Sequence, residues 1–240
     1  MELVGRFRYG AGVRRAILET FTASVAAKRQ FVRENLGALV EVVELIAEAL
    51  RGGHKLLLFG NGGSAADAQH IAAEFVNRFK IERVPLPAIA LTTDTSALTS
   101  IANDYGYAEV FAKQVCALGR PGDAALAIST SGNAANVLRA VAACKRLDIR
   151  TVGLTGGSGG KLAQAADVVL RVAATTDTAR IQETHILIGH VICEQVDALL
   201  FGPKALRGSA KVEKRAGSPF ETAAERMRPP RGERKNAPKK

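Results

Sequence analysis

The chain has 240 residues, of which 47% are hydrophobic, so it can bury one substantial core, and one domain with appendages is the default expectation. Its three cysteines, Cys116, Cys144 and Cys193, are scattered and form no CxxC pair, which argues against a disulfide framework and against a zinc ribbon. We expect them to be reduced and buried, as fits a cytoplasmic protein. The net charge of +10 resides at one end: residues 204–240 hold 12 basic and 4 acidic residues, whereas the other 203 hold 21 and 19.

The first fifty residues predict two helices. Apolar side chains recur every three or four positions over 14–35 and again over 37–51, and Gly52-Gly53 marks the stop. We therefore expect an N-terminal helical hairpin over 1–53, packed as part of the same domain as the residues that follow. The N-terminus lacks the apolar stretch of a signal peptide.

Five short runs rich in Leu, Ile, Val and Ala follow, and they alternate with helical stretches: 55–59, 87–91, 124–128, 151–154 and 168–172. They are apolar throughout, as expected for strands covered on both faces. Strands separated by helices imply right-handed crossovers and a parallel sheet. The sequence thus predicts an α/β fold with a doubly wound, five-stranded parallel sheet over 54–203.

A long C-terminal helix is predicted from about Thr178 to Leu200, ending at Gly202-Pro203. Its apolar surface is interrupted by polar side chains, so we interpret it as a buried helix and expect no membrane span. The tail, 204–240, is rich in Lys, Arg, Gly, Pro and Ser and is predicted to be disordered. A basic tail on a neutral body supports salt-sensitive, nonspecific contact with nucleic acid at best, so we expect no specific nucleic-acid partner.

Two loops at strand ends are suited to an anion, because ligands of open α/β sheets bind at the carboxyl ends of the strands. One loop runs from Gly60 to Ser64, where the glycines allow close backbone approach and Ser64 is expected to cap the next helix. The other runs from Ser129 to Asn133 and offers three hydroxyls. Either loop alone would be as consistent with a plain turn, but two on one sheet edge favour a ligand. Between them, Asp94 and Thr95 are candidates for sugar hydroxyls, beside their simpler role as a helix cap.

A third group of residues is suited to proton transfer. His70 and Glu74 are four residues apart on one predicted helix, so they share a face. The long late helix carries Gln182, His185 and His190. A single helical histidine is more often a satisfied core residue than a functional one. An otherwise apolar helix with all three polar groups is harder to explain by packing alone.

Taken together, FGNGGSAADAQHIAAEF, LTTDTSALTSIANDYG, ISTSGNAANV, TGGSGGKLAQAAD and RIQETHILIGH resemble the phosphoheptose isomerases along about 55–200. The resemblance implies the SIS fold, which is flavodoxin-like in its sheet. It implies that Glu74 and His190 form an acid/base pair, and that one Zn²⁺ per active site is held by His70, Glu74, Gln182 and His190. The substrate-binding positions that it implies, together with those proposed from the loops, are Asn61, Gly62, Gly63, Ser64, Asp94, Thr95, Ser129, Thr130, Ser131, Asn133, Asn136 and Gln182.

The same resemblance implies conversion of sedoheptulose 7-phosphate to D-glycero-D-manno-heptose 7-phosphate through an enediol, the first step toward ADP-heptose for the lipopolysaccharide core. It also implies a cytoplasmic homotetramer. Gln182 and His190 are eight residues apart, about 12 Å along a helix, so one helix does not comfortably bring both to one ion. We therefore expect sites assembled between subunits.

Two points keep alternatives open. Some members of the family place an Asp where this chain has Ala179, with Asp177 two positions earlier, which puts an equivalent role for Asp177 in doubt. Related SIS proteins without catalysis bind a replication-initiator protein, but they lack the full acid/base set that Glu74 and His190 provide here. An isomerase for another ketose phosphate stays open as well.

Overall fold

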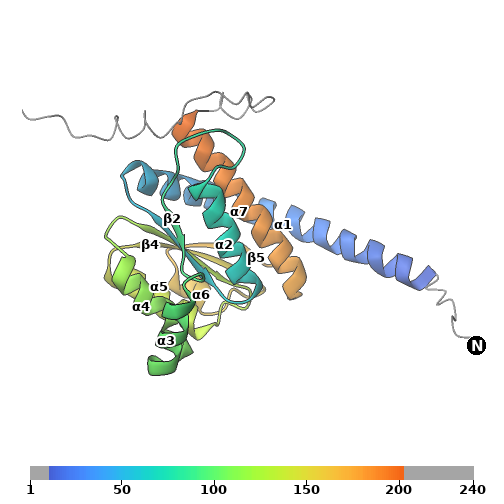
Figure 1. The fold of residues 1–240 in the computed structure, drawn as a ribbon. Coiled ribbons are helices and arrows are strands. Elements are labelled where there is room, and N and C mark those ends of the chain that lie inside the picture. The colour runs from blue at the N-terminus through green and yellow to red at the C-terminus, as the bar shows by residue number, and fades with distance from the viewer. Residues whose placement is uncertain (1–10, 203–240) are drawn as a thin grey trace, which may run out of the picture.

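A computed structural model describes residues 11–202 and contains one five-stranded parallel sheet with the strand order β2-β1-β3-β4-β5 (Figure 1). This is the flavodoxin-like order, in which the chain changes direction across the sheet between β1 and β3. The predicted parallel α/β sheet is confirmed. The strands are β1 (Leu56–Gly60), β2 (Ala88–Ala90), β3 (Ala124–Ser129), β4 (Arg150–Gly156) and β5 (Val168–Val172).

Helices cover both faces of the sheet, as the uniformly apolar strands require. Leu56 and Leu58 of β1 point into a core shared with α1, α2 and α7, whereas Leu57 and Phe59 point into a core shared with α4 and α5. The helical elements are α1 (Ala11–Arg51), α2 (Gly63–Val76), α3 (Thr95–Tyr105), the short 3-10 turn η1 (Tyr107–Glu109), α4 (Val110–Leu118), α5 (Ala135–Arg146), α6 (Leu162–Ala165) and α7 (Thr178–Phe201).

The predicted N-terminal hairpin is wrong, because α1 is one continuous helix of 41 residues. Gly37 lies inside it without breaking it: a glycine in a helix costs only about 1 kcal/mol relative to alanine, and this one has open space around its Cα. The second half of α1 packs on the body through side chains such as Phe31 and Ile46. The first half projects beyond the body (Figure 1).

The helix α7 lies beside α1 and α2 and is predicted well in its bounds (Figure 1). By length and composition alone it is apolar enough to cross a membrane, but core helices pass the same test. Ile188, Ile192 and Val196 are buried in the core against α1 and α2, so α7 is a core helix here. Its N-cap is Asp177, whose carboxylate accepts a hydrogen bond from the backbone N–H of Ala179 at 2.9 Å.

All three cysteines are free thiols, but they are not all buried as predicted. Cys144 and Cys193 lie in the two cores, where burial raises the pKa of each thiol, that of Cys144 to about 12. Cys116 is exposed near the end of α4, on the solvent face of that helix. The predicted disorder of the tail concerns residues outside those that the structure describes.

Candidate active site

The loop after β1 turns into α2 through glycine rather than through a serine cap. Gly62 is the N-cap of α2, with a φ of 56° that favours glycine, and no side chain caps this helix. The predicted capping role of Ser64 is therefore wrong: Ser64 lies within the first turn and is buried. A Cβ on Gly60 would lie 2.8 Å from the Cβ of Ser64, so this loop and the helix are packed too closely for any side chain there.

The loops after β3 and β4 meet at the same edge of the sheet. A Cβ on Gly132, whose φ is 67°, would fall 1.9 Å from the carbonyl oxygen of Gly159. The backbone N–H of Lys161 donates to Oδ1 of Asn133 at 3.1 Å, which adds a second tie between the two loops. Ser129 is buried at the end of β3, and the helix α5 begins two residues after Asn133.

A pocket of about 240 Å³ opens between these loops and the start of α7. Thr130 and Ser131, two of the residues predicted to bind the substrate, line it, and so do further hydroxyl groups that the sequence analysis missed. For one of these missed residues the sequence did contain a cue: Ser158 follows a predicted strand and is flanked by glycines, as in the two loops that were predicted to bind an anion. The lining residues are Thr130, Ser131, Gly156, Gly157, Ser158, Thr176, Thr178 and Ile181. Several hydroxyls and backbone amides beside a helix start suit a phosphate group.

Two of the predicted substrate residues bind each other. The side-chain amides of Asn61 and Asn136 exchange a pair of hydrogen bonds, each 2.8 Å long, which joins the loop after β1 to the start of α5. The hydroxyl of Tyr107, from η1, donates to Oδ1 of Asn61 at 3.1 Å. Tyr107 was not predicted, and nothing in its local sequence pattern signals this contact. The network fixes the orientation of the Asn61 amide at the sheet edge.

Asp94 and Thr95 start α3 on the same side of the molecule. One carboxylate oxygen of Asp94 accepts a hydrogen bond from the backbone N–H of Ala97 at 2.9 Å, which is an ordinary N-cap. Both Asp94 and Thr95 are exposed. The capping role is therefore present, and the exposure leaves both side chains accessible to a ligand.

The helices α2 and α7 run side by side, with corresponding residues in contact. A Cβ on Gly63 would fall 2.3 Å from Nε2 of Gln182, and one on Gly189 would fall 2.5 Å from Cδ1 of Ile71. Gln182 therefore packs against the start of α2, and His190 lies two turns further along beside His70. Within one chain, Gln182 is separate from the histidines, as the spacing on the helix predicts.

His70, Glu74 and His190 converge. Nε2 of His70 lies 2.9 Å from Nε2 of His190 and 3.4 Å from Oε1 of Glu74. One ligand atom from each of the three residues falls within 4.8 Å of the others. His70 is exposed and the other two are half-buried, so the group opens to solvent on one side. The rings of Phe79 and His190 stack, with centroids 5.4 Å apart.

The chemistry of this group fits a zinc ion. Two imidazole nitrogens and one carboxylate oxygen are a known donor set for catalytic zinc, and such sites keep a further position for water or substrate. The half-open cluster of His70, Glu74 and His190 offers that set from two adjacent helices. Its side chains are also of the kind that transfers protons.

The remaining histidine of α7 is a core residue. His185 is fully buried, and its Nε2 donates to the backbone carbonyl of Thr155 at 3.1 Å. Burial lowers the pKa of His185 to about 4, so the ring is neutral at physiological pH. On α2, burial also raises the pKa of Asp67, which the nearby His70 partly offsets. Neither residue joins the converging group.

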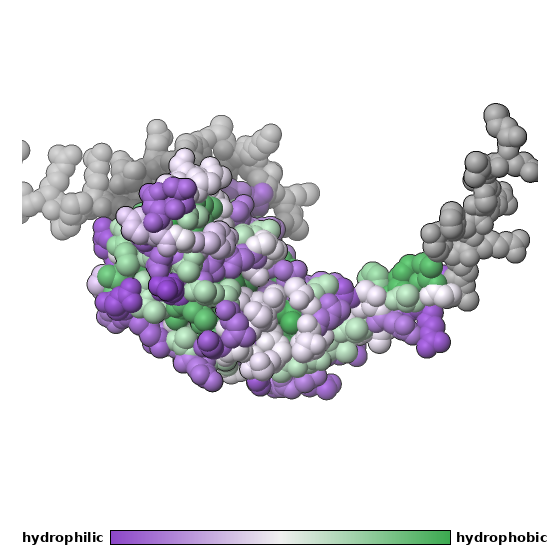
Figure 2. Space-filling view, turned by 90° about the horizontal axis from the view of Figure 1, so that it is seen from below, coloured by the Kyte–Doolittle hydropathy of each residue, from purple (hydrophilic) through white to green (hydrophobic). Residues whose placement is uncertain are grey.

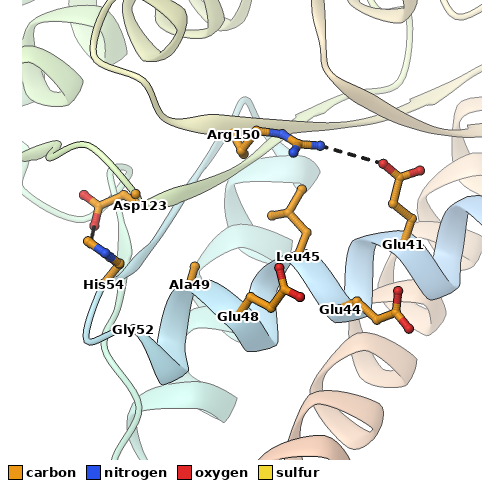
Figure 3. Close-up of a pocket in the computed structure, with 10 residues that line it drawn as sticks. Glu41, Glu44, Leu45, Glu48, Ala49, Gly52, His54, Asp123 and Arg150 are labelled. Carbon is orange, nitrogen blue, oxygen red and sulfur yellow. Dashed lines mark ion pairs between the residues drawn. The ribbon is translucent and has the colours of Figure 1, made fainter.

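A larger pocket, of about 420 Å³, lies at the opposite edge of the sheet, where β1, β3 and β4 begin (Figure 3). Three glutamates of α1 line it, and one of them, Glu41, pairs with Arg150 at 3.7 Å. His54 faces Asp123 on its other side. Ligands of open α/β sheets bind at the carboxyl ends of strands, and an excess of carboxylates disfavours phosphate. This pocket is therefore not the active site.

Comparison with known proteins agrees with the geometry. The SIS domain family matches residues 20–156. A phosphoheptose isomerase of Thermodesulfovibrio yellowstonii is 51% identical over 195 residues, covering 81% of this chain and 96% of that protein. One from a Roseiflexus species is 54% identical over 187 residues, covering 78% and 94%. The solved phosphoheptose isomerase of Neisseria gonorrhoeae has a TM-score of 0.73 and 46% identity, over 78% of this chain and 99% of that chain.

Proposed function

The chain belongs to the phosphoheptose isomerases of the SIS-domain family, and from this premise we propose that it converts sedoheptulose 7-phosphate to D-glycero-D-manno-heptose 7-phosphate. It is an aldose–ketose isomerase that acts on a sugar phosphate. We further propose that it works in the cytoplasm and that its product is the precursor of ADP-heptose for the lipopolysaccharide core. We expect neither a membrane nor a specific nucleic acid to take part in this reaction.

Substrate binding would begin at the phosphate. The hydroxyls of Thr130 and Ser131 and the start of α7 line the small pocket, and hydroxyl and backbone N–H groups can donate hydrogen bonds to a phosphate without adding a fixed positive charge. Ser64, buried in the first turn of α2, and Ser129, buried at the end of β3, are further phosphate-binding candidates in this proposal. The sugar would extend from there toward α2, past Asn61 and Gln182, with Asp94 and Thr95 available to its hydroxyls.

Isomerisation moves a proton between two neighbouring carbons and a second proton between their oxygens. Glu74 would take the proton from the carbon next to the carbonyl and return it to the neighbouring carbon, which passes the substrate through an enediol. His190 would move the proton between the two oxygens, because imidazole can donate or accept near neutral pH. The contact between His70 and His190 orients the second ring for this role.

A zinc ion would be held by His70, Glu74 and His190, with Gln182 of a neighbouring subunit as the fourth ligand, and would supply Lewis acidity at the substrate carbonyl. A carboxylate that binds a metal is a weaker base, so metal binding and proton abstraction compete for Glu74. Elemental analysis together with chelation tests this ligand set. Full activity in thoroughly stripped protein would leave the three residues as plain acid/base groups.

The observation that carries the proposal is the convergence of His70, Glu74 and His190 from α2 and α7. The separate pocket rich in hydroxyls, at the start of α7, supports it. The test is to incubate the purified protein with a panel of ketose phosphates and to follow aldose formation. We expect sedoheptulose 7-phosphate to react fastest and free sedoheptulose to react poorly. No aldose from any ketose phosphate would disprove the function.

We also propose a homotetramer with active sites between subunits. Apolar side chains are exposed along α1 at helical spacing, and the projecting end of the helix displays them most openly (Figure 2). They include Ile17, Phe21, Val25, Val32, Leu36 and Val40. An apolar stripe of this length needs a partner surface. Light scattering tests the assembly, and a monomer in solution would overturn the shared-site argument.

A further inference from the structure

The segment between α2 and β2, residues 77–87, joins the end of α2 to one face of α7 (Figure 1). It contacts that face at three successive positions, roughly one turn apart. The pairs are Phe79 with His190, Lys80 with Glu194, and Arg83 with Asp197. The segment therefore connects the helix of His70 and Glu74 to the helix of His190.

Arg83 makes the most extensive of these contacts. Its side chain is only 2% exposed, and its Nε donates to Oδ1 of Asp197, itself fully buried, at 2.9 Å. Nη2 donates to the backbone carbonyl of Glu74 at 2.8 Å, and Nη1 donates to the carbonyl of Phe75 at 2.7 Å. Weaker contacts reach the carbonyls of Asn77 and Val84, at 3.1 and 3.2 Å.

The carbonyls of Glu74, Phe75 and Asn77 belong to the C-terminal end of α2, where backbone oxygens lack a partner within the helix. A guanidinium is favourable there because it supplies several planar donors and a positive charge at the negative end of the helix dipole. Arg83 thus holds the main chain of Glu74 itself. The same group is tied to α7 two turns beyond His190.

Stability alone does not account for a buried ion pair at this position. Removing two charges from water costs several kcal/mol per ion, and well-packed apolar residues of similar volume often stabilise a protein equally or better. One oxygen of Asp197 also has no hydrogen-bond partner among the described residues. An apolar pair at these positions would not donate a hydrogen bond to the backbone carbonyl of Glu74, as Arg83 does.

We propose that Arg83 is a positioning residue of the isomerase, which fixes the distance and orientation between Glu74 on α2 and His190 on α7. It touches neither the substrate nor the reacting atoms. This inference rests on the proposed function for the roles of Glu74 and His190. A misplacement of about 1 Å between reacting groups can cost roughly 10²-fold in rate, so a change at Arg83 should lower kcat and leave KM nearly unchanged.

The test compares variants that separate the ion pair from the carbonyl contacts. Arg83→Lys keeps a positive charge near Asp197 but lacks the planar fork, and we expect kcat to fall about 10- to 100-fold with KM within about 2-fold. Asp197→Asn keeps an acceptor for Arg83 and should retain kcat within about 3-fold. Lys80→Met removes the exposed pair from the same segment and serves as the matched control, with wild-type kcat expected.

A double variant distinguishes a loss of positioning from a loss of folding. Arg83→Met with Asp197→Leu removes both buried charges together, so its melting temperature should be close to that of the wild type while kcat stays low. Wild-type kcat in this variant or in Arg83→Lys would overturn the proposal. So would an equal loss in kcat for Lys80→Met, because the effect would then not be specific to Arg83.

A second measurement is independent of turnover. The imidazole NMR signals of His70 and His190 in the metal-free protein should shift in Arg83→Lys and stay in place in Lys80→Met. Unchanged signals in Arg83→Lys would also overturn the proposal. If the wild type does not isomerise sedoheptulose 7-phosphate, the proposed function fails, and the NMR comparison still decides whether Arg83 positions the two histidines.

Discussion

The two parts of the proposed active site are built in different ways. The proposed phosphate pocket is lined mainly by loops, in which glycine backbone and small hydroxyl side chains lie close to a strand end or a helix start. The proposed catalytic group consists of long side chains on two helices, and His70 and His190 are 120 residues apart. Each wall of the pocket is a short segment at the end of a strand or the start of a helix, and close backbone contact joins the two loops, whereas the second part depends on the packing of α2 against α7.

This difference predicts which substitutions disrupt each part. The loops should be disrupted when a side chain is added where two backbone segments lie in close contact. The helical group should lose its geometry or its chemistry when a functional atom is removed or when one helix moves relative to the other. The predictions below test this contrast, beginning with the largest expected effect.

The strongest test removes the functional atoms of the helical group. Glu74→Gln and His190→Gln should each lower turnover by at least about 10²-fold, which is the usual scale for a lost acid or base. Steady-state kinetics of the purified variants measure the effect, and circular dichroism controls for the fold. Rates near wild type in either variant would remove that residue from the acid/base pair.

The second test adds one methyl group to a loop. Gly132→Ala would place a Cβ at a positive φ and within 1.9 Å of the Gly159 carbonyl oxygen, so the two loops must separate. We expect a loss of about 2–3 kcal/mol in the free energy of unfolding and a higher KM. Gly37→Ala is the matched control. It lies in open space on a helix, and it should stabilise the protein by up to about 1 kcal/mol.

The third test concerns His185, which ties α7 to the loop edge through the carbonyl of Thr155. Its pKa is lowered from 6.5 to about 4 in the folded protein, so the unfolded chain binds more protons between these values. Stability from this residue is therefore complete above pH 6.5 and is lost as the pH falls toward 4. Urea unfolding should show a loss of about 2 kcal/mol between pH 6.5 and 5.

His185→Gln is the control for that pH dependence, and the slopes are compared rather than the absolute stabilities. The variant should lose less stability over the same pH range, because it no longer contributes a group that takes up a proton on unfolding. An identical slope in both proteins would contradict the assignment of His185 as a buried neutral imidazole.

The smallest effect is expected from one hydroxyl of the loops. Ser131→Ala removes one donor toward the phosphate, and a hydrogen bond to a charged group contributes about 1.5–3 kcal/mol, so KM should rise roughly 10-fold. The melting temperature should hardly change, because the residue lines an open pocket. Equal turnover of phosphorylated and free sugar by the wild type would contradict the phosphate role of the whole loop.

The sequence predicts the sheet well because its signals are local. All five strands and the bounds of α7 follow from apolar runs and from a glycine stop. The N-terminal hairpin was a wrong prediction because the apolar pattern was divided between residues 35 and 37, whereas the helix continues through Gly37 and packs on the body through Phe31 and Ile46. The cap at Ser64 failed for a related reason, since Gly62 starts the helix two residues earlier.

For the site, the sequence singled out His70, Glu74 and His190, but their mutual distances follow from the pairing of α2 with α7. It also separated Gln182 from the histidines by helix length alone. It missed Tyr107 and Arg83, whose partners are distant in sequence and whose local patterns are those of ordinary surface residues. Contacts of this kind depend on the third dimension and leave no periodic signal.

The unequal environments of the three thiols should allow one of them to be labelled selectively. Thiolate is the reactive form, and the raised pKa values of Cys144 and Cys193 keep both protonated and sheltered within the cores. Maleimide reagents should therefore modify Cys116 alone in the native protein, with no engineering of the sequence. A fluorophore at that position, on the face of the sheet remote from α1 and α7, would report on subunit exchange and ligand binding in the unaltered enzyme.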